Sequence, residues 1–248
     1  MSGLLLVTGA SRGIGAACAR LAAQRGYAVG VNYVADTSAA ERVCADVRAA
    51  GAEAIALKAD VANEDEVLAM FAAIDARGLP LAGLVNNAGV VGTVAPFTAY
   101  TRARLERTFA VNVLGAFLVA REALKRMVTT GGGQGGAIVN VSSAAARIGS
   151  PNEFIDYAAS KGAIDALTLG LAKEFGTQGV RVNAVRPGII DTEIHASAGA
   201  PDRVARFAAA VPLARAGSVE EVARTILWLL SDEASYVTGA LLDVAGGR

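Results

Sequence analysis

Residues that build metal sites and disulfide frameworks are scarce in this sequence, which has one histidine, His195, and two cysteines, Cys18 and Cys44. A zinc site made of histidine and cysteine ligands needs about four of them. Two cysteines on segments of helical periodicity do not form the disulfide framework of a small secreted protein. We therefore expect no metal centre, and reduced thiols that pack as small apolar residues.

The sequence also lacks an excess of charge of either sign, because 23 lysines and arginines balance 23 aspartates and glutamates. Proteins that bind nucleic acid or anionic membranes use a positive field that this balance does not provide. No apolar run reaches the ~18 residues of a membrane span, and the first run, Leu4–Val7, is too short for a signal peptide. We expect a cytoplasmic protein that binds neither nucleic acid nor membranes.

Apolar residues and glycine are plentiful instead: 53% of the 248 residues are hydrophobic and 28 are glycine. Short apolar runs, typical of buried parallel strands, alternate with stretches of helical periodicity along the whole chain. The expected strands are Leu4–Val7, Ala28–Tyr33, Ala54–Lys58, Leu84–Asn86, Ala137–Val141, Arg181–Val185 and Ala240–Asp243. The expected helices are Ile14–Arg25, Ala39–Ala50, Glu64–Arg77 after an N-cap at Asn63, Arg102–Met127, Tyr157–Phe175 and Glu220–Leu230.

This alternation predicts an α/β protein in which a parallel sheet lies between two layers of helices, because parallel strands are joined by right-handed crossovers. No change of composition marks a linker, so we expect a single domain over residues 1–248. The longest irregular stretch, at about residues 189–217, has the length of a lid over a binding site.

The first expected strand leads into a glycine-rich turn, Thr8–Gly15, with the sequence TGASRGIG. Gly9 allows a tight turn, Gly13 lets the backbone approach a pyrophosphate, and Gly15 lets the helix pack close to the sheet. The N-terminus of the following helix offers N–H groups to an anion. The strand before the turn and the helix after it favour dinucleotide binding over an ordinary glycine turn. The turn also contains Ser11, Arg12 and Ile14.

The end of the second expected strand indicates which dinucleotide binds. NAD-binding folds usually place an acidic residue there to hold the ribose hydroxyls, whereas this strand ends in Asn32 and Tyr33, with no carboxylate before Asp36. The missing carboxylate removes a repulsion on a 2′-phosphate, and Arg12 can supply positive charge to that phosphate. We expect NADP(H) rather than NAD(H), with Asn32 and Tyr33 beside the cofactor.

Four motifs occur in order along the chain: Thr8–Gly15, Asn86-Asn87-Ala88-Gly89, Tyr157-x-x-x-Lys161 and Pro187-Gly188. Together they resemble the short-chain dehydrogenase/reductase family, over almost the whole chain. The resemblance implies a three-layer Rossmann fold with a doubly wound, seven-stranded parallel sheet, a nicotinamide cofactor, and hydride transfer to or from a carbonyl or hydroxyl group. It also implies a homotetramer or a dimer, and the tail from Tyr236 to Gly247 resembles the family segment that packs between subunits, which favours the homotetramer.

The same resemblance implies roles for four catalytic residues. Tyr157 would be the acid/base, Lys161 its activator, Ser143 the partner that orients the substrate oxygen, and Asn112 the residue that holds a water in a proton relay. Ser143 precedes the alanine-rich turn as in the family pattern, and Ser142 stays open as the alternative. Ser143 is 14 positions and Ser142 15 positions from Tyr157, whereas the family more often shows about 13, which indicates a one-residue insertion. We expect the extra residue near residues 150–156.

The resemblance further implies a set of residues around the cofactor. Two of them match the pair beside the adenine, three match the turn that lines the cofactor, and four match the stretch over the nicotinamide. In that order they are Asp60 and Val61; Asn87, Ala88 and Gly89; and Pro187, Gly188, Ile190 and Thr192.

The expected chemistry follows from the tyrosine and lysine pair. A free tyrosine has a pKa near ~10 and is a poor proton shuttle around neutrality, but a nearby ammonium favours the phenolate and should lower that pKa. Tyr157 and Lys161 are four residues apart on an expected helix, so they share a face. The substrate stays open among a sugar, a 3-oxoacyl thioester and another small ketone. A catalytically silent NADP(H)-binding sensor or scaffold is the alternative function.

Overall fold

The computed structural model describes residues 3–192 and 203–248 of the chain. Its strands form one parallel sheet of seven strands in the order β3-β2-β1-β4-β5-β6-β7. The expected α/β fold, a three-layer Rossmann fold with a doubly wound parallel sheet, is thereby confirmed. The strands are β1 (Leu4–Val7), β2 (Ala28–Tyr33), β3 (Ala54–Lys58), β4 (Leu81–Asn86), β5 (Gly136–Val141), β6 (Val180–Pro187) and β7 (Leu241–Val244).

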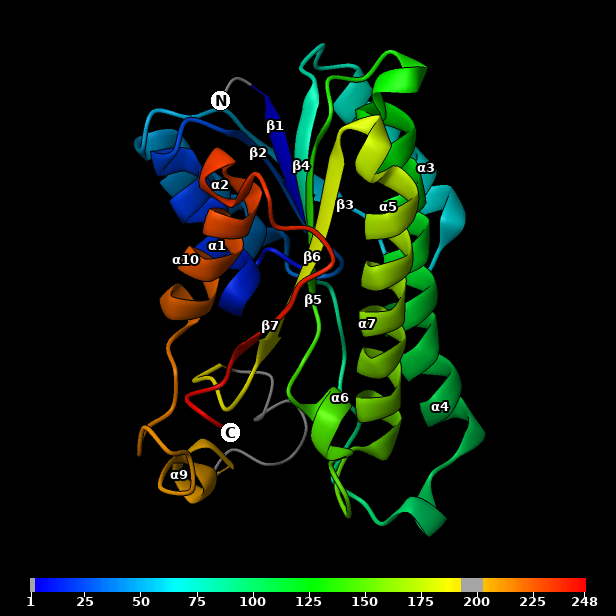
Figure 1. Cartoon of the computed structure of the whole chain (residues 1–248), viewed down its shortest axis with the longest axis vertical. Helices are drawn as coiled ribbons and strands as arrows, with labels where there is room; N and C mark the ends of the chain where they lie inside the picture. The colour runs from blue at the N-terminus through cyan, green and yellow to red at the C-terminus, as the bar shows by residue number, and fades with distance from the viewer. Residues whose placement is uncertain (1–2, 193–202) are drawn as a thin grey trace.

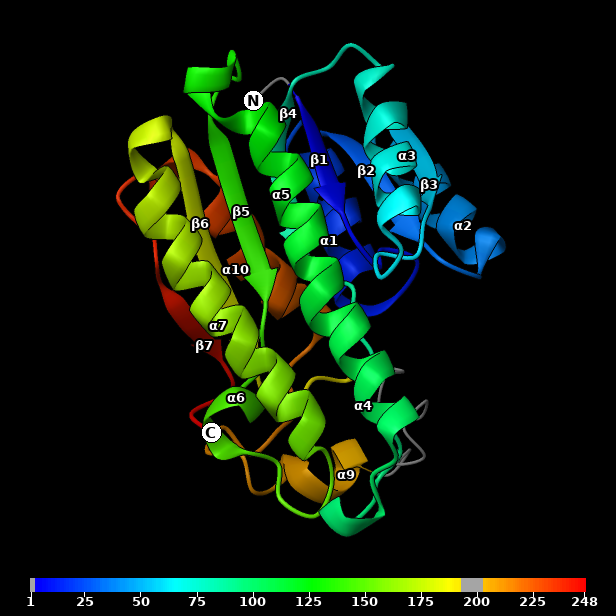
Figure 2. The same cartoon turned by 90° about the vertical axis from the view of Figure 1, so that its right-hand side faces the viewer.

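Helices cover both faces of the sheet (Figures 1 and 2). One layer consists of α1 (Gly13–Gln24), α2 (Thr37–Ala49) and α10 (Val219–Leu230), and the other of α3 (Glu64–Asp75), α5 (Ala116–Met127) and α7 (Ile155–Phe175). Three shorter helices lie beyond the carboxyl ends of the strands: α4 (Arg102–Phe109), α6 (Ala145–Ile148) and α9 (Arg203–Ala208). Short 3₁₀ turns occur at Phe97–Ala99, Thr129–Gly131, Gly176–Gln178 and Asp232–Ala234.

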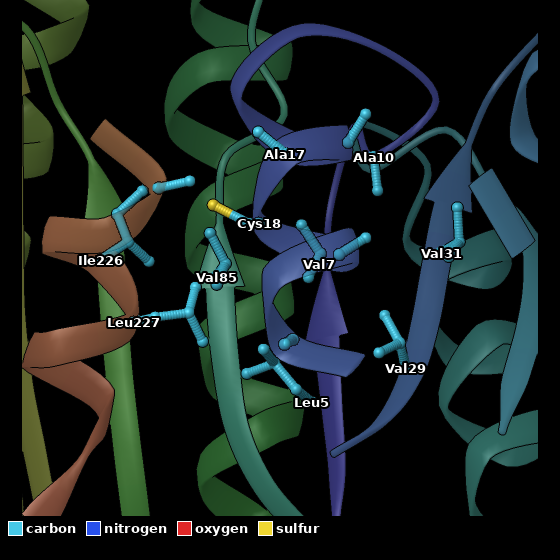
Figure 3. Close-up of a cluster of buried hydrophobic side chains, with 14 of the residues drawn as sticks. Leu5, Val7, Ala10, Ala17, Cys18, Val29, Val31, Val85, Ile226 and Leu227 are labelled. Carbon is cyan, nitrogen blue, oxygen red and sulfur yellow. The ribbon is translucent and has the colours of Figure 1, made fainter. Parts of the chain in front are cut away.

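Alternate residues of β1 pack against opposite helical layers, because successive side chains of a strand point to opposite faces. Leu5 and Val7 belong to the cluster that includes α1, α2 and α10, whereas Leu4 and Leu6 belong to the cluster with α3 and α5. Figure 3 shows part of the first cluster, in which Cys18 of α1 lies among apolar side chains. Cys18 and Cys44 are both buried, and burial raises the pKa of both thiols. Their expected role as small core residues is confirmed.

The helix expected over Arg102–Met127 is interrupted. Its first part, α4, ends at Phe109, a π-helical turn covers Ala110–Gly115, and α5 begins at Ala116. The apolar spacing does not reveal the wider turn, because a short change of period is hidden within an otherwise helical pattern. At the end of the turn, a Cβ on Gly115 would lie 2.7 Å from Cγ2 of Val61. The glycine therefore lets this helix approach the segment after β3.

Other boundaries differ less from those expected. Strand β4 begins three residues earlier than expected, at Leu81, and helix α6 was not expected. Asn63 does cap α3, since its side chain accepts hydrogen bonds from the backbone N–H groups of Asp65 and Glu66. Within residues 3–192 and 203–248, no helix is long and apolar enough to cross a membrane.

The expected lid at about residues 189–217 lies partly outside the described residues, as does His195. The described part contains α9 and a parallel bridge between Ile190 and Gly217. A lid function for this stretch stays a prediction.

Candidate active site

The carboxyl ends of β1, β4, β5 and β6 surround one cleft. The strand order reverses between β1 and β4, and open α/β sheets bind ligands in the crevice beside such a switch point. The residues that line the cleft are Ile14, Asn87, Gly89, Val91, Val141, Ser142, Ser143, Ala144, Ala145, Ile148, Ser150, Phe154, Tyr157, Lys161, Pro187, Gly188, Ile189, Ile190, Thr192 and Arg248. Residues from every expected motif therefore meet at this cleft.

The glycine turn has the conformation that its sequence requires. Gly9 and Gly13 have φ angles of 61° and 56°, which L side chains rarely adopt. A Cβ on Gly15 would lie 2.5 Å from the carbonyl oxygen of Gly9, so only glycine lets α1 start this close to the turn. A Cβ on Gly13 would come near just one described atom, Cγ2 of Thr192 at 4.0 Å, so the space above this turn is open.

The N-terminus of α1 has the features of an anion site. Within the described residues no side chain caps this helix, and its first turn contains no acidic residue. By contrast, Asp36, Asn63, Thr101 and Ser218 cap α2, α3, α4 and α10 with their side chains. Uncapped N–H groups and the helix dipole together attract a phosphate. The N-terminal end of α1 therefore fits the pyrophosphate of a dinucleotide, with Ser11 half-buried and Arg12 exposed beside it.

A buried hydroxyl ties the glycine turn to the next motif. Oγ1 of Thr8 accepts hydrogen bonds from the backbone N–H groups of Asn87 and Ala88, both at 2.9 Å. The Asn87 side chain donates in return to the carbonyl oxygens of Thr8 and Gly9, at 2.8 and 3.2 Å. Asn87 therefore holds the turn after β1 against the turn after β4, and Thr8 is a positioning residue that the sequence analysis missed.

At the end of β2, Asn32 also holds the glycine turn. Its buried side chain accepts from the backbone N–H of Gly9 at 3.1 Å and donates to the carbonyls of Leu57 and Ala59. Tyr33 is buried, and the first carboxylate after the strand, Asp36, accepts from the Ala39 N–H as the cap of α2. The side chain of Asn32 thus positions the turn.

Tyr157 and Lys161 both lie on α7 and face the cleft. The Lys161 ammonium is buried, donates to the carbonyl oxygen of Val141 at 2.7 Å, and lies 5.5 Å from the centroid of the Tyr157 ring. Burial lowers the pKa of Lys161 to about 8, against the opposing influence of the Asp165 charge. The lysine therefore places a cationic group beside the phenol and can lose its charge near neutral pH.

The two serines after β5 have different surroundings. Ser142 is buried, and its hydroxyl donates to the carbonyl oxygen of Lys161 at 3.1 Å. Ser143 is half-buried, and its oxygen accepts from the backbone N–H of Ala145 at 3.1 Å. The hydroxyl proton of Ser143 is not used in that contact, which favours Ser143 as a donor to a substrate oxygen.

Asn112 lies in the π-helical turn and is buried. Its side chain accepts from the N–H of Val90 at 2.8 Å and donates to the Val90 carbonyl at 2.9 Å and to Oγ of Ser160 at 3.0 Å. Oγ of Ser160 donates to the carbonyl of Tyr157. A Cβ on Gly89 would lie 3.3 Å from Oδ1 of Asn112, so these groups form one corner of the site. A proton relay through Asn112 stays a prediction.

The remaining predicted cofactor residues flank the cleft. Asp60 accepts from the Ala62 N–H at 3.0 Å and pairs with Arg107 at 3.1 Å, while Val61 is buried. Gly188 packs closely, because a Cβ there would lie 2.8 Å from Cα of Ala245. The residues after β6 that line the cleft are Pro187, Gly188, Ile190 and Thr192, whereas Asp60 and Val61 lie outside its lining.

Arg104 and Asp156 form a buried ion pair beside the site, and the sequence analysis missed it. Nε and Nη2 of Arg104 contact the two Asp156 oxygens at 2.7 and 2.9 Å, and Thr108 donates to the same carboxylate at 3.3 Å. The guanidinium also lies 3.7 Å from the centroid of the Tyr100 ring. Because Asp156 precedes Tyr157, this pair anchors the start of α7. No local motif marks two partners that are 52 residues apart.

Comparison with known proteins agrees with this geometry. A family model described as enoyl-(acyl carrier protein) reductase matches residues 9–248. The uncharacterized oxidoreductase YgfF of Escherichia coli (strain K12) is 56% identical over 99% of both chains. The 3-oxoacyl-[acyl-carrier-protein] reductase of Synechocystis sp. is 41% identical, over 98% of this chain and 95% of that protein. This chain belongs to the short-chain dehydrogenase/reductase family.

A solved structure leads to the same conclusion. The 3-ketoacyl-(acyl-carrier-protein) reductase of Brucella melitensis, crystallised with NADH, superposes with a TM-score of 0.91 at 31% identity, over 99% of this chain and 98% of that one. The chain is therefore a dehydrogenase/reductase of a family that uses a nicotinamide cofactor. Nothing in these similarities supports the catalytically silent sensor.

Proposed function

We propose that this protein transfers a hydride between NADP(H) and a carbonyl or hydroxyl group of a small molecule, with Ser143, Tyr157 and Lys161 as catalytic residues. The observation that carries the proposal is the buried ammonium of Lys161, 5.5 Å from the Tyr157 ring in the cleft beside the uncapped N-terminus of α1. The proposal leaves the substrate open among sugars, 3-oxoacyl thioesters and other small ketones.

The residues of this chain would handle the proton while the nicotinamide, when bound, supplies or accepts the hydride. Tyr157 gives its phenolic proton to the substrate oxygen during reduction, and the Lys161 charge stabilises the phenolate that remains. Ser143 donates a hydrogen bond to the same oxygen. Asn112 positions α7 through Ser160, whose hydroxyl donates to the Tyr157 carbonyl. Gly9, Gly13 and the first N–H groups of α1 would hold the pyrophosphate.

The Tyr157→Phe variant tests the proton transfer. General acid–base catalysis contributes roughly 100-fold to 10,000-fold, so we expect kcat to fall by at least roughly 100-fold while the dissociation constant for NADPH, measured by calorimetry, stays unchanged. Tyr236→Phe is the matched control, because Tyr236 is fully exposed outside the cleft. Near-normal turnover of Tyr157→Phe would overturn the assignment.

Arg12 and the end of β2 support the preference for NADP(H). The first carboxylate after β2, Asp36, is engaged as the cap of α2, and Arg12 is exposed in the glycine turn. A hydrogen bond to a charged partner contributes roughly tenfold or more in affinity. We therefore expect Arg12→Ala to lower kcat/KM for NADPH by roughly tenfold and to leave the value for NADH within about twofold. Arg20→Ala is the control, because Arg20 pairs with Asp46 away from the turn. Wild-type preference for NADH would refute this part of the proposal.

Exposed apolar residues support a homotetramer. Leu114 and Phe117 are 60% and 46% exposed, and with Leu167 and Leu171 they line an apolar groove over α5 and α7. Leu242 on β7 is exposed on a different element. Monomers rarely expose several large apolar groups together. Sedimentation at micromolar concentration tests this, and a 25.1 kDa species would contradict the tetramer. A cytoplasmic location also stays a proposal.

A further inference from the structure

The charged residues that line the cleft are both cationic. Among the described lining residues, Lys161 and Arg248 carry charge and none is acidic. Lys161 is already assigned to the chemistry, because its ammonium donates to Val141 and lies beside Tyr157. Arg248 reaches the cleft from the other end of the sequence and has no part in the proton transfer described above. Its presence there needs a separate explanation.

Three arginines lie close together at this end of the molecule, and two of them have acidic partners. Arg147 on α6 pairs with Asp243 on β7 at 3.1 Å, and Arg206 on α9 pairs with Glu153 at 3.3 Å. Within residues 3–192 and 203–248, no carboxylate pairs with the Arg248 guanidinium. Its Cζ atom lies 5.3 Å from the centroid of the Phe207 ring. Of the three, Arg248 is therefore the cation without an acidic partner among the described residues.

The position of Arg248 is determined by contacts of its backbone. Nη2 of Arg147 donates to the main-chain oxygen of Arg248 at 2.8 Å, and the Arg248 N–H donates to the Ala245 carbonyl at 3.2 Å. Both views place the C-terminus near α6 and α9, the end where the carboxyl edges of the strands lie (Figures 1 and 2). Arg248 is half-buried, its guanidinium lies over the Phe207 ring, and the residue lines the cleft.

The wall of the cleft is mostly apolar. Val91, Ile148, Phe154 and Ile189 line it together with Tyr157. A ligand that contacts these residues needs a hydrocarbon skeleton, with a reactive oxygen at the tyrosine. Because a guanidinium recognises a carboxylate through two parallel hydrogen bonds, a carboxylate of charge −1 matches a single arginine in both charge and shape.

We propose that Arg248 binds a carboxylate group of the substrate, so that the protein acts on oxo acids or hydroxy acids with an apolar skeleton. This inference rests on the proposed function, since it specifies the substrate class of the same cleft. The carboxylate would be held by Arg248 while the carbonyl oxygen lies at Tyr157 and Ser143. Arg248 is then a specificity-determining residue, separate from the proton transfer.

The test uses oxo acids with increasing separation between carbonyl and carboxylate, each paired with its neutral primary amide. We expect wild-type kcat/KM for one or more acids to exceed that for the matching amide by at least roughly tenfold, since a hydrogen bond to a charged group contributes about that much. Arg248→Gln should bring the ratio of acid to amide close to one, and Arg248→Lys should retain part of it. Added salt should lower the wild-type ratio.

Arg206→Gln is the matched control, because Arg206 lies over the same Phe207 ring at 4.9 Å but pairs with Glu153 and does not line the cleft. Its ratio of acid to amide should stay within about twofold of wild type. An equal fall of the acid-to-amide ratio in both variants would mean that the arginines act through their combined positive charge, and it would overturn a site at Arg248. A ratio that Arg248→Gln leaves unchanged would overturn it too, and so would stronger preference for a phosphate ester than for the carboxylate.

A second measurement separates this inference from the proposed function. If the wild-type protein reduces the amides but shows no preference for the acids, only the inference fails. If it reduces no ketone with either cofactor, the proposed function fails, and calorimetry still tests Arg248. In that measurement cyclohexanecarboxylate should bind the wild-type protein at least roughly tenfold more tightly than cyclohexanecarboxamide, and the difference should disappear in Arg248→Gln. Equal binding of the two compounds would overturn the inference.

Discussion

Replacing Arg104 by methionine leaves a buried carboxylate without its counter-ion. The Asp156 side chain is 0% exposed and that of Arg104 is 12% exposed, with contacts of 2.7 and 2.9 Å between them. Removing one partner of a buried pair destabilises a protein by about 3–5 kcal/mol, because the other charge stays desolvated. Taking the lower figure for a guanidinium that retains some solvent contact, we expect Arg104→Met to lower the unfolding free energy by about 3 kcal/mol.

The direction of the pH dependence follows from the pKa of Asp156. Burial alone would raise that pKa, but the hydrogen bonds from Arg104 and from the Tyr157 N–H outweigh burial and lower it. The pair therefore stabilises the native protein above the ordinary carboxyl pKa, and this contribution is lost as the pH falls through the depressed folded value. In Arg104→Met the carboxyl stays buried and its pKa rises. The destabilisation should be largest at neutral pH and should shrink towards pH ~4.

Denaturant titrations followed by tryptophan fluorescence, at neutral and acid pH, measure these differences. The double variant Arg104→Met/Asp156→Asn should recover part of the lost stability, because the amide removes the uncompensated charge. Since Asp156 precedes Tyr157 at the start of α7, kcat should fall more than the affinity for NADPH. An Arg104→Met protein within about 1 kcal/mol of wild type, or a double variant no more stable than the single one, would refute the argument.

Three further outcomes follow from contacts in the site. Gly15→Ala brings a Cβ to 2.5 Å from the Gly9 carbonyl oxygen, so unfolding free energy should fall by about 1–3 kcal/mol and NADPH should bind more weakly in calorimetry; unchanged values would contradict close packing. Thr8→Val removes the acceptor of two backbone N–H groups and should destabilise by about 1–3 kcal/mol, while Thr8→Ser should stay near wild type in the same titration. Between pH 8 and 10 the wild type should gain about 2 kcal/mol over Lys161→Met, because the folded lysine, with a pKa of about 8, releases its proton before the unfolded one at 10.5. Parallel stability curves for the two proteins would count against this.

The fold could be predicted because its information is local. Each strand is a short apolar run, and β1 shows why this is enough: Leu4 and Leu6 pack on one helical layer, Leu5 and Val7 on the other. A strand that is buried on both faces appears in the sequence as a continuous apolar run, whereas a strand with one exposed face alternates apolar and polar residues. The interruption of the long helix before Ala116 is different, since it lies where Gly115 packs closely against Val61 of a distant segment.

The part of the site that could be predicted consists of residues in motifs with a physical reason for their spacing. Gly9 and Gly13 have left-handed backbone conformations, and Tyr157 and Lys161 share a helical face. The sequence could not separate Ser142 from Ser143, because only the fold shows which hydroxyl is used inside the protein.

The residues that were missed act through partners distant in sequence. Thr8 acts on the turn after β4, and Arg104 meets a carboxylate on α7. Arg248 had no motif to mark it, because it reaches the cleft only through the return of the tail past α6. Such positions show no periodicity, and only the three-dimensional neighbours of each side chain reveal them.

The π-helical turn at Ala110–Gly115 makes this segment the place where the long helix best tolerates a deletion. A turn of this kind is wider than an α-helical turn and takes up a surplus residue, so removing one residue here would narrow it and leave α4 and α5 in phase. Each residue of a regular α-helix advances the chain by about 100° around its axis, so the same deletion inside α4 or α5 would rotate Arg104 away from Asp156 or Val119 out of the interior.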